Sequence, residues 1–515
     1  MRSGISRSAK RLTIKYYRKM KDNIRQSRLN WRAVVAVVAM LSPFCSFGQL
    51  RIDWQYCYGV EGQDYATSIL PTENGVLVFG TVHHPLNPGM VSCEVENNWR
   101  TPWLIRIDNQ GGLLDQQCWQ SFVTSESISI RKAKTEDNEY YMNTHEFGEV
   151  TIHKIDDGLN EIWNRRIGYF GTDMLPTDDG GVLLGNSYGH LGKEYYDGED
   201  SLLKLDRNGN PEWRISIDMK VKEIAQAKDG GFFVGGYIWD SDEHFLLKIT
   251  QDGQLEWSRT YDVTPVLIQE LEDGLILASS TSFAGEGAHG NSDIWLARTD
   301  EVGNVLWSHF YGGSQADAIT SFCPNSNDGF TVFGYSSSND GDVQSNGNEY
   351  HVSNLWIFHV DASGNLVWER SIGSPSYHEY IYSVAKTGEY KYVIAANMFW
   401  EETPSGDVNC SNSAEIPNSG TNYWVLHVTD TINSADISEQ LSQIGAHIFP
   451  NPTKDNVHIQ GIEPLEVLVY DAHGQCIKDL HDTNEIPLGD LPKGMYLIKA
   501  VLADGKVYSD KVVKE

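Results

Sequence analysis

Cysteine is scarce in this sequence: there are seven residues in a chain of 515, and none forms a Cys-x-x-Cys pair. Without such a pair the sequence gives no sign of a zinc or redox site. So few cysteines also cannot stabilise a chain of this length by disulfides in place of a hydrophobic core. Basic residues are also few, with 40 Lys and Arg against 70 Asp and Glu. The resulting net charge of −30 argues against nucleic acid as a partner.

Long apolar runs are missing as well, since no segment reaches the ~20 residues that a membrane-spanning helix needs. The strongest apolar run follows Arg32 within a basic leader, residues 1–48, that holds eleven Lys or Arg and the single acid Asp22. Small residues, Ser46 and Gly48, stand where a signal peptidase reads. This order of regions predicts a signal peptide over residues 1–48.

Two details of this leader stay open. Met20 is an alternative start, and Gln49 is the expected first residue of the mature chain. An N-terminal membrane anchor is the other interpretation of the apolar run. A lipoprotein is disfavoured, because the residues before Cys45 are not the usual small ones. We therefore expect no transmembrane segment in the mature chain.

Glycine and aromatic residues are abundant, with 47 Gly, 25 Tyr and 15 Trp, which favours an all-β chain. One short pattern recurs: a turn with Asp and Gly is followed by a strand with Trp, as in DRNGNPEW at 206 and DASGNLVW at 361. A period of 40 to 60 residues is typical of one small antiparallel sheet per repeat. Aligned in this way, the repeated tryptophans are Trp119, Trp163, Trp213, Trp257, Trp307 and Trp368.

An apolar strand precedes each turn in seven places, and a third apolar strand begins each unit in seven places. In LWIFHVD at 355 both faces are apolar, which is typical of a strand packed between two sheets. The last unit lacks its Trp strand, and RIDWQYCYG, with Trp54, stands alone before the first unit. We therefore predict a seven-bladed β-propeller over residues 49–432, closed by its N-terminal strand.

The pattern changes after a polar stretch, residues 433–443, that is expected to be a linker. Residues 444–515 alternate like the strands of a small β-sandwich. They resemble the C-terminal sorting domain of the type IX (Por) secretion system of Bacteroidetes. The residues that carry this resemblance are Pro450, Asn451, Pro452, Tyr470, Asp471, Gly474, Gly494, Tyr496, Lys511, Val512 and Val513.

This resemblance implies export through the periplasm and outer membrane, then removal of the domain by the C-terminal signal peptidase of that machinery. The product would be secreted or held at the outer-membrane surface. The repeats themselves, such as residues 336–368, are similar to propeller-like repeats of secreted Bacteroidetes proteins. That similarity implies a fold and an export route, and supplies no catalytic residues.

Two short motifs match catalytic or cofactor patterns by chance. GNSYG at 185–189 would make Ser187 a hydrolase nucleophile only at a strand-to-helix turn. GEGAHG at 285–290 would bind a dinucleotide only if it opened a helix. Neither context is expected in a propeller, so we predict no catalytic residue and no cofactor-binding residue.

Asp340 and Asp342 offer hard oxygen ligands and are weak calcium candidates, although no EF-hand spacing is present. Solvated turn chemistry is the competing interpretation. Cys93 and Cys410 fall before matching strands of the first and last blades, which closure makes neighbours. They are therefore a candidate disulfide, although sequence alone fixes no pairing.

The repeated tryptophans are expected to pack in the core, because a ligand site would not need the same residue in every blade. Aromatics in irregular loops are the better candidates for binding: Tyr195, Tyr196, Trp239, Phe399 and Trp400. The sequence thus predicts a secreted or cell-surface binding or scaffold module for a glycan or protein ligand. The alternative is a polysaccharide-active enzyme with paired carboxylates in the propeller funnel.

Overall fold

The computed structural model describes the chain from Leu50 to Lys514. Every regular element in this part is a β-strand, and no described segment forms a helix that could cross a membrane. The residues left out are 1–49, 60–61, 84–90, 92–99, 120–127, 136, 147–148, 169–172, 186–200, 218, 239–242, 283–286, 326–328, 347–351, 400–405, 410–419, 431–438, 441–446, 471–475, 482, 490, 503–506 and 515.

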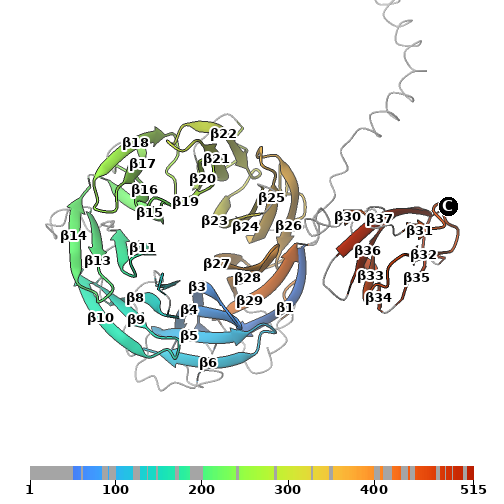
Figure 1. The fold of residues 1–515 in the computed structure, drawn as a ribbon, viewed down its shortest axis with the longest axis horizontal. Coiled ribbons are helices and arrows are strands. Elements are labelled where there is room, and N and C mark those ends of the chain that lie inside the picture. The colour runs from blue at the N-terminus through green and yellow to red at the C-terminus, as the bar shows by residue number, and fades with distance from the viewer. Residues whose placement is uncertain are drawn as a thin grey trace, which may run out of the picture. The chain divides into compact units, whose positions relative to one another are not determined.

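Seven antiparallel sheets form a β-propeller, and each sheet is one blade (Figure 1). Blades 1 to 3 are β3 (Tyr65–Thr72), β4 (Gly75–His83), β5 (Arg100–Asp108) and β6 (Leu113–Cys118); β7 (Ser129–Lys132), β8 (Tyr140–Glu146), β9 (Glu149–Ile155) and β10 (Glu161–Gly168); and β11 (Asp173–Pro176), β12 (Val182–Gly185), β13 (Ser201–Leu205) and β14 (Pro211–Ser216).

The later blades repeat this order. Blades 4 to 6 are β15 (Lys220–Gln226), β16 (Phe232–Tyr237), β17 (His244–Ile249) and β18 (Leu255–Tyr261); β19 (Leu267–Glu270), β20 (Leu275–Thr281), β21 (Asp293–Thr299) and β22 (Val305–Tyr311); and β23 (Asp317–Pro324), β24 (Phe330–Ser336), β25 (Asn354–Val360) and β26 (Leu366–Ile372). Blade 7 is β27 (Glu379–Gly388), β28 (Lys391–Phe399), β29 (Gly420–Asp430) and β1 (Leu50–Tyr58), with β2 (Gly62–Gln63) beside β29.

The hydrophobic cores lie between neighbouring blades. Strand β25 is buried along its whole length. Leu355 and Ile357 pack into the cluster shared with blade 7, whereas Trp356 and Phe358 pack into the cluster shared with blade 5. The expectation that both faces of this strand are covered is confirmed. Burial on two sides explains why these strands consist of continuous apolar runs.

Blade 7 is completed by the two ends of the propeller sequence. Strand β1 pairs antiparallel with β29, and Trp54 lies opposite His427. Asp53 Oδ2 accepts hydrogen bonds from His427 Nδ1 at 2.7 Å and from Thr429 Oγ1 at 2.6 Å. Burial works against ionisation of Asp53, but these bonds and the Arg51 charge lower its pKa to about 2. The N-terminal strand is therefore held by polar contacts as well as by the sheet ladder.

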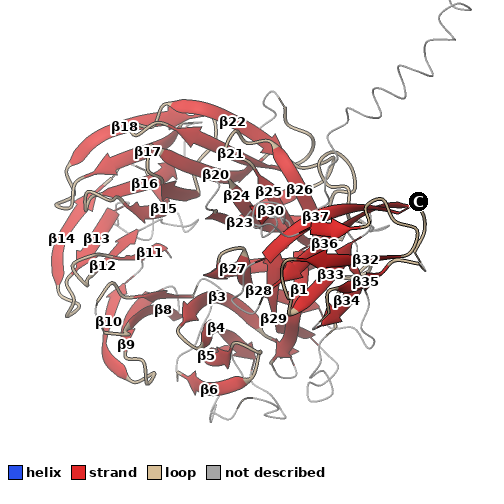
Figure 2. Ribbon diagram, turned by 45° about the vertical axis from the view of Figure 1, so that its right-hand side comes forward, coloured by secondary structure: helices blue, strands red, loops and turns tan. Residues whose placement is uncertain are grey.

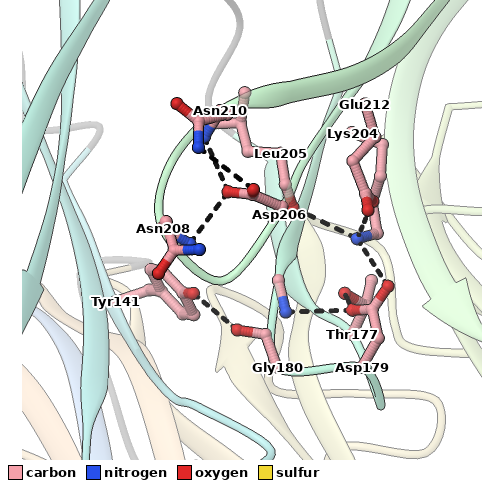
Figure 3. A network of polar contacts seen from close by, with 11 residues as sticks. Tyr141, Thr177, Asp179, Gly180, Lys204, Leu205, Asp206, Asn208, Asn210 and Glu212 are labelled. Carbon is pink, nitrogen blue, oxygen red and sulfur yellow. Dashed lines mark hydrogen bonds and ion pairs between the residues drawn. The ribbon is translucent and has the colours of Figure 1, made fainter.

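The repeated turn has the same hydrogen bonds in successive blades, and Figure 3 shows the turn of blade 3. Asp206 Oδ1 accepts from the backbone N–H of Asn208 at 2.8 Å and of Asn210 at 2.7 Å. Gly209 has φ of +80°, a conformation that favours glycine. Beside the turn, the buried ammonium of Lys204 is paired with Asp179 and Glu212, each at 2.8 Å.

At three joints the turn also accepts a hydrogen bond from a tryptophan of the preceding blade. Trp163 Nε1 of blade 2 donates to the Arg207 carbonyl of blade 3 at 3.1 Å. The same bond joins successive blades elsewhere, from Trp54 to Asn109 at 2.8 Å and from Trp307 to Ala362 at 3.2 Å. The turn is repeated because it forms a joint between blades.

Of two expectations about the tryptophans, one is confirmed and one is corrected. All six pack in or against the cores between blades, with Trp368 buried and the others half-buried. Trp119, however, is not an equivalent of the others. In blade 2, Trp163 pairs with a residue of the third strand. At the equivalent position of blade 1 the paired residue is Asp115, which lies four residues before Trp119.

The C-terminal strands form a small β-sandwich of two sheets, drawn as strands in Figure 2. One sheet is β30 (Glu439–Gln440), β37 (Val507–Lys514), β36 (Gly494–Val501), β33 (Glu466–Tyr470) and β34 (Cys476–His481). The other is β31 (His447–Phe449), β32 (Asn456–Gln460) and β35 (Glu485–Pro487). Their shared core includes Val457, Ile486, Val469, Ile498 and Val512. Residues 439–440 of the expected linker thus pair with β37.

Removal of residues 49–60 tests the closure. The deletion leaves β29 as an open sheet edge and exposes the core that Cys57 and Tyr58 help to fill. We expect the thermal midpoint to fall by roughly 10 °C or more, measured by circular dichroism. An unchanged midpoint would mean that β1 does not close the ring.

Candidate functional site

The calcium candidates lie at the joint between blades 5 and 6. Asp340 Oδ1 accepts from the Ser314 backbone N–H at 2.7 Å, and the Asp342 N–H donates to the Gly312 carbonyl at 2.9 Å. The sequence DGDV at 340–343 recurs as SGDV at 405–408. Asp407 makes the same backbone bond one blade later, to the Gly373 carbonyl at 3.0 Å. No group of three or more potential metal-ligating side chains occurs among the described residues. The geometry assigns these loops to holding blades together, and calcium binding by Asp340 and Asp342 stays a prediction.

The innermost strands carry a second group of polar residues. The first strands of blades 1, 2, 3, 4 and 7 contact their neighbours around the ring axis (Figure 1). Their pairing register places seven residues at equivalent positions, one in each blade: Ser68, Ser129, Asp173, Glu223, Leu267, Ser321 and Ser383. Four blades thus have serine here, and two adjacent blades have acids.

In blades 7 and 1, serine at this position bridges to the next blade. Ser383 Oγ accepts from the Ile69 backbone N–H at 3.2 Å, and Ser68 Oγ donates to the Ile130 carbonyl at 3.1 Å. Asp173 takes the same role toward the Ile224 backbone N–H. Its Oδ2 atom is buried and has no hydrogen-bond partner. The contact between blades 3 and 4 therefore leaves one carboxyl oxygen of Asp173 able to accept a further hydrogen bond.

Arg131 completes a charged cluster with the two acids. Its guanidinium donates to Ser68 Oγ at 3.2 Å, and its charge lowers the pKa of both Asp173 and Glu223. Burial among the inner strands outweighs that effect and raises the pKa of both acids, and the charge of Asp173 raises the pKa of Glu223 further. Both residues keep some exposure. The cluster can present a neutral carboxyl, a carboxylate and a guanidinium to one ligand.

No sequence motif marks these three residues, so they were missed as site residues. The signal was present in an alignment of the first strands, in which YATSI and EYIYSV have serine where TDMLP and KEIAQ have acids. Short strands with no fixed catalytic spacing give little basis for such an alignment without the pairing register.

Blade 2 contains a second arrangement that resembles catalytic geometry. His153 Nε2 lies 3.0 Å from Thr144 Oγ1, and His153 Nδ1 lies 2.6 Å from Glu161 Oε2. This is the order of a nucleophile, a base and an orienting acid. Thr144 is only 3% exposed, however, so its hydroxyl is closed to a substrate carbonyl. Burial also lowers the pKa of His153 in spite of Glu161. The group is a buried polar network.

Other candidates from the sequence lie outside the described residues. These are Ser187, Tyr195, Tyr196, Trp239, Trp400 and the side chain of Phe399. Cys93 and Cys410 are outside them too, so their pairing stays a prediction. Cys57 and Cys118 each take part in a disulfide, and Cys323 is a free, buried thiol.

The expected sorting residues meet at the C-terminal strand. Asn451, between Pro450 and Pro452, donates from Nδ2 to the Lys511 carbonyl at 2.6 Å and accepts from the Val513 N–H at 2.9 Å. These bonds fasten the Pro-Asn-Pro turn to β37. Gly494 begins β36, and the Tyr496 hydroxyl donates to the Pro492 carbonyl at 2.6 Å. The Pro-Asn-Pro turn and the C-terminal strand are thus one structural unit.

Comparison with known proteins supports this assignment. The family model of the secretion system C-terminal sorting domain matches residues 447–515. This segment is the type IX sorting domain, which directs export to the cell surface or the extracellular space. A search of curated proteins gave no match.

Solved structures similar to the chain include BamB from Moraxella catarrhalis, with 12% identity over 90% of this chain and 100% of that one, at a TM-score of 0.36. The Dos1 propeller has 11% identity over 75% and 92%, at a TM-score of 0.34. A protein of unknown function from Bacteroides caccae has 15% identity over 53% and 90%, at a TM-score of 0.31. Likeness at this level says nothing about activity.

The thiols can be tested by alkylation followed by peptide mass spectrometry. Burial raises the pKa of Cys323 to about 11, against a small opposite effect of Lys386, so the folded thiol should resist alkylation. Denaturant alone should expose Cys323, whereas Cys57 and Cys118 should also need a reductant. Free Cys93 and Cys410 in the same experiment would rule out their disulfide.

Deletion of residues 440–515 tests the sorting assignment. The propeller core contains none of these residues, so the shortened protein should fold and remain in the periplasm. Fusion of the segment and a signal peptide to a neutral reporter should bring the reporter to the surface of a host with this secretion system. Normal surface delivery of the shortened protein would contradict the assignment.

Proposed function

We propose that this protein is a non-catalytic binding or scaffold module that acts outside the cell and takes a hydroxyl-rich ligand, such as a glycan, at the axis of the propeller. One observation carries the proposal: equivalent inner positions hold serine in four blades and the acids Asp173 and Glu223 in two adjacent blades, beside Arg131. Carboxyl, carboxylate and guanidinium groups are complementary to the hydroxyls of a sugar.

Export supplies the setting for this role. The leader, residues 1–48, would act as the signal peptide of a Bacteroidetes protein, and the type IX machinery would then carry the chain across the outer membrane. Its C-terminal signal peptidase would remove the sorting domain. The mature propeller would be released or attached to the cell surface, where extracellular glycans are available.

A second candidate is a polysaccharide hydrolase, and the same acids support it. Hydrolysis of a glycosidic bond uses two carboxyl groups, one protonated as the acid and one ionised as the nucleophile or base. Burial and mutual repulsion at Asp173 and Glu223 favour such a division of roles. We prefer the binding function, because the acids already have a structural role that accounts for them without catalysis. Both interact with the Arg131 charge, and Asp173 accepts from the Ile224 backbone N–H.

The double variant Asp173→Asn, Glu223→Gln separates these functions from folding. On a glycan array we expect the mature protein to bind, and the double variant to lose about tenfold or more in affinity, because each charged hydrogen bond contributes roughly 1.5–3 kcal/mol. Ser321→Ala, at the equivalent position of blade 6, is the matched control and should bind normally.

A reducing-sugar assay on the same three proteins decides between the two candidates. Turnover by the wild type that disappears in the double variant would establish the hydrolase instead. Equal glycan binding by all three proteins would place the ligand elsewhere.

A further inference from the structure

Three joints between blades share one backbone design. In each, a glycine follows the outer strand of one blade, and an acidic residue stands near the start of the next blade. The backbone N–H of this acid donates to a carbonyl of the first blade. The residue after that carbonyl is a buried Asn or Asp on the third strand of the first blade. These bonds are Asp64 to Thr421, Asp317 to Ser292 and Glu379 to Ser353, each 2.8 Å long. The glycines are Gly59, Gly312 and Gly373.

The joints differ in one chemical respect. The buried residue that faces the acid across the glycine is Asn422 between blades 7 and 1, and Asn354 between blades 6 and 7. Between blades 5 and 6 it is Asp293. An asparagine amide can turn its NH₂ group toward a carboxylate, whereas an ionised aspartate has no proton to donate. This joint therefore holds a second ionisable carboxyl group where the other two hold a neutral amide.

The two carboxyl groups are confined on the same side of Gly312. A Cβ atom on this glycine would lie 2.5 Å from Asp293 Oδ1 and 2.5 Å from Asp317 Oδ2. Asp293 is 1% exposed and Asp317 is fully buried. Asp293 Oδ1 has no hydrogen-bond partner, while Asp293 Oδ2 accepts from the His289 backbone N–H at 2.8 Å. Two buried, adjacent carboxylates with one unsatisfied oxygen are costly when both are ionised.

The surroundings only partly offset this charge. Asp317 accepts from the Gly313 N–H at 2.8 Å and from the hydroxyls of Ser336 and Ser338. His289 lies over the joint, but its Nδ1 is 3.5 Å from Asp342 Oδ2 and 3.0 Å from the Gly312 carbonyl.

Asp342, and Asp340 beyond it, add further negative charge on the side of the DGDV loop. Asp340 Oδ1 is occupied by the Ser314 N–H at 2.7 Å. Among the described residues, the titratable groups that face this joint are four acids and one histidine, and the histidine is paired with the acid of the loop rather than with the buried pair.

We propose that Asp293 and Asp317 share one proton in the folded ring, so that the joint between blades 5 and 6 responds to pH while the two joints with asparagine do not. The shared proton lets one carboxyl group donate to the other, whereas the other two joints hold a neutral amide in place of the second carboxyl group. Loss of that proton leaves two buried carboxylates in repulsion and weakens the contact between the blades.

The direction of the effect follows from the Asp317 carboxyl. Burial, assisted by the Asp293 charge, raises its pKa to about 6, although the hydrogen bonds from Ser336, Gly313 and Ser338 act in the opposite direction. In the unfolded chain an aspartate has a pKa of ~3.9. The folded state thus binds the proton more tightly. Its stabilisation is complete below about pH 4 and is lost as the pH rises through about 6.

The test compares the full mature protein with Asp293→Asn, which gives this joint the asparagine of the other two. Between pH 5 and pH 8, above the sequence pI of about 4.8, the unfolding equilibrium of the wild type should shift by about tenfold, or roughly 2–3 °C in thermal midpoint. The variant, which keeps the buried Asp317 but lacks the Asp293 charge, should shift by less. A difference that is constant with pH would overturn the proposal.

The reciprocal variant Asn354→Asp introduces a second acid at the joint between blades 6 and 7, opposite Glu379, and should create a similar pH dependence there. Infrared spectroscopy gives a readout without unfolding. Near pH 5.5 a protonated-carboxyl band should remain in the difference between the spectra of the wild type and Asp293→Asn, since bands of other neutral carboxyls such as Glu223 are common to both proteins. The absence of a difference band would contradict the proposal.

A bound cation is the competing explanation of the same acids. All measurements are therefore made in EDTA and repeated with calcium. If calcium raises the thermal midpoint of the wild type but not of Asp293→Asn, a cation rather than a proton joins the two carboxylates, and the proposal is wrong. An equal response of both proteins supports the shared proton.

Discussion

Every blade of this protein depends on the pairing between β1 and β29. Without β1, blade 7 would have three strands, and the backbone N–H and C=O groups along β29 would face solvent. With it, the first and last parts of the propeller sequence belong to one sheet, and a chain of seven similar units becomes a closed ring. Asp53 contributes to this closure through its bonds to His427 and Thr429.

Closure matters because the cores lie between blades rather than within them. A blade buries its two faces only when both neighbours are present, as the opposite faces of β25 show. The polar joints follow the same logic. A turn in one blade holds the tryptophan of the previous one, and a buried acid follows the glycine at three joints. An unusual residue in one blade, such as Asp173 or Asp293, can therefore affect the contact between that blade and its neighbour.

Much of this fold could be predicted from the sequence, since seven similar strand patterns and one isolated Trp54 strand are local signals. The alignment was wrong at Trp119, because only strand pairing shows that Asp115 occupies the equivalent position. The tryptophans pack in or against the cores between blades, as expected, but the hydrogen bonds of their indole N–H groups across the joints were not predicted. Two groups of residues could not be predicted from the sequence: the cluster of Asp173, Glu223 and Arg131, and the pair of Asp293 and Asp317. Each joins residues of different blades that no sequence spacing connects. The sorting residues, by contrast, form a compact motif and were recognised directly.

Hydrogen exchange on the intact protein tests the closed ring most directly. If β1 is an integral strand of blade 7, the amides of β1 that pair with β29 should be protected to the same degree as those of the outer strands in the other blades, such as β18 and β22, and should exchange together with β29. Rapid exchange of residues 50–58, with β29 exchanging ahead of the other third strands, would show that the ring is open at this blade and would contradict the account.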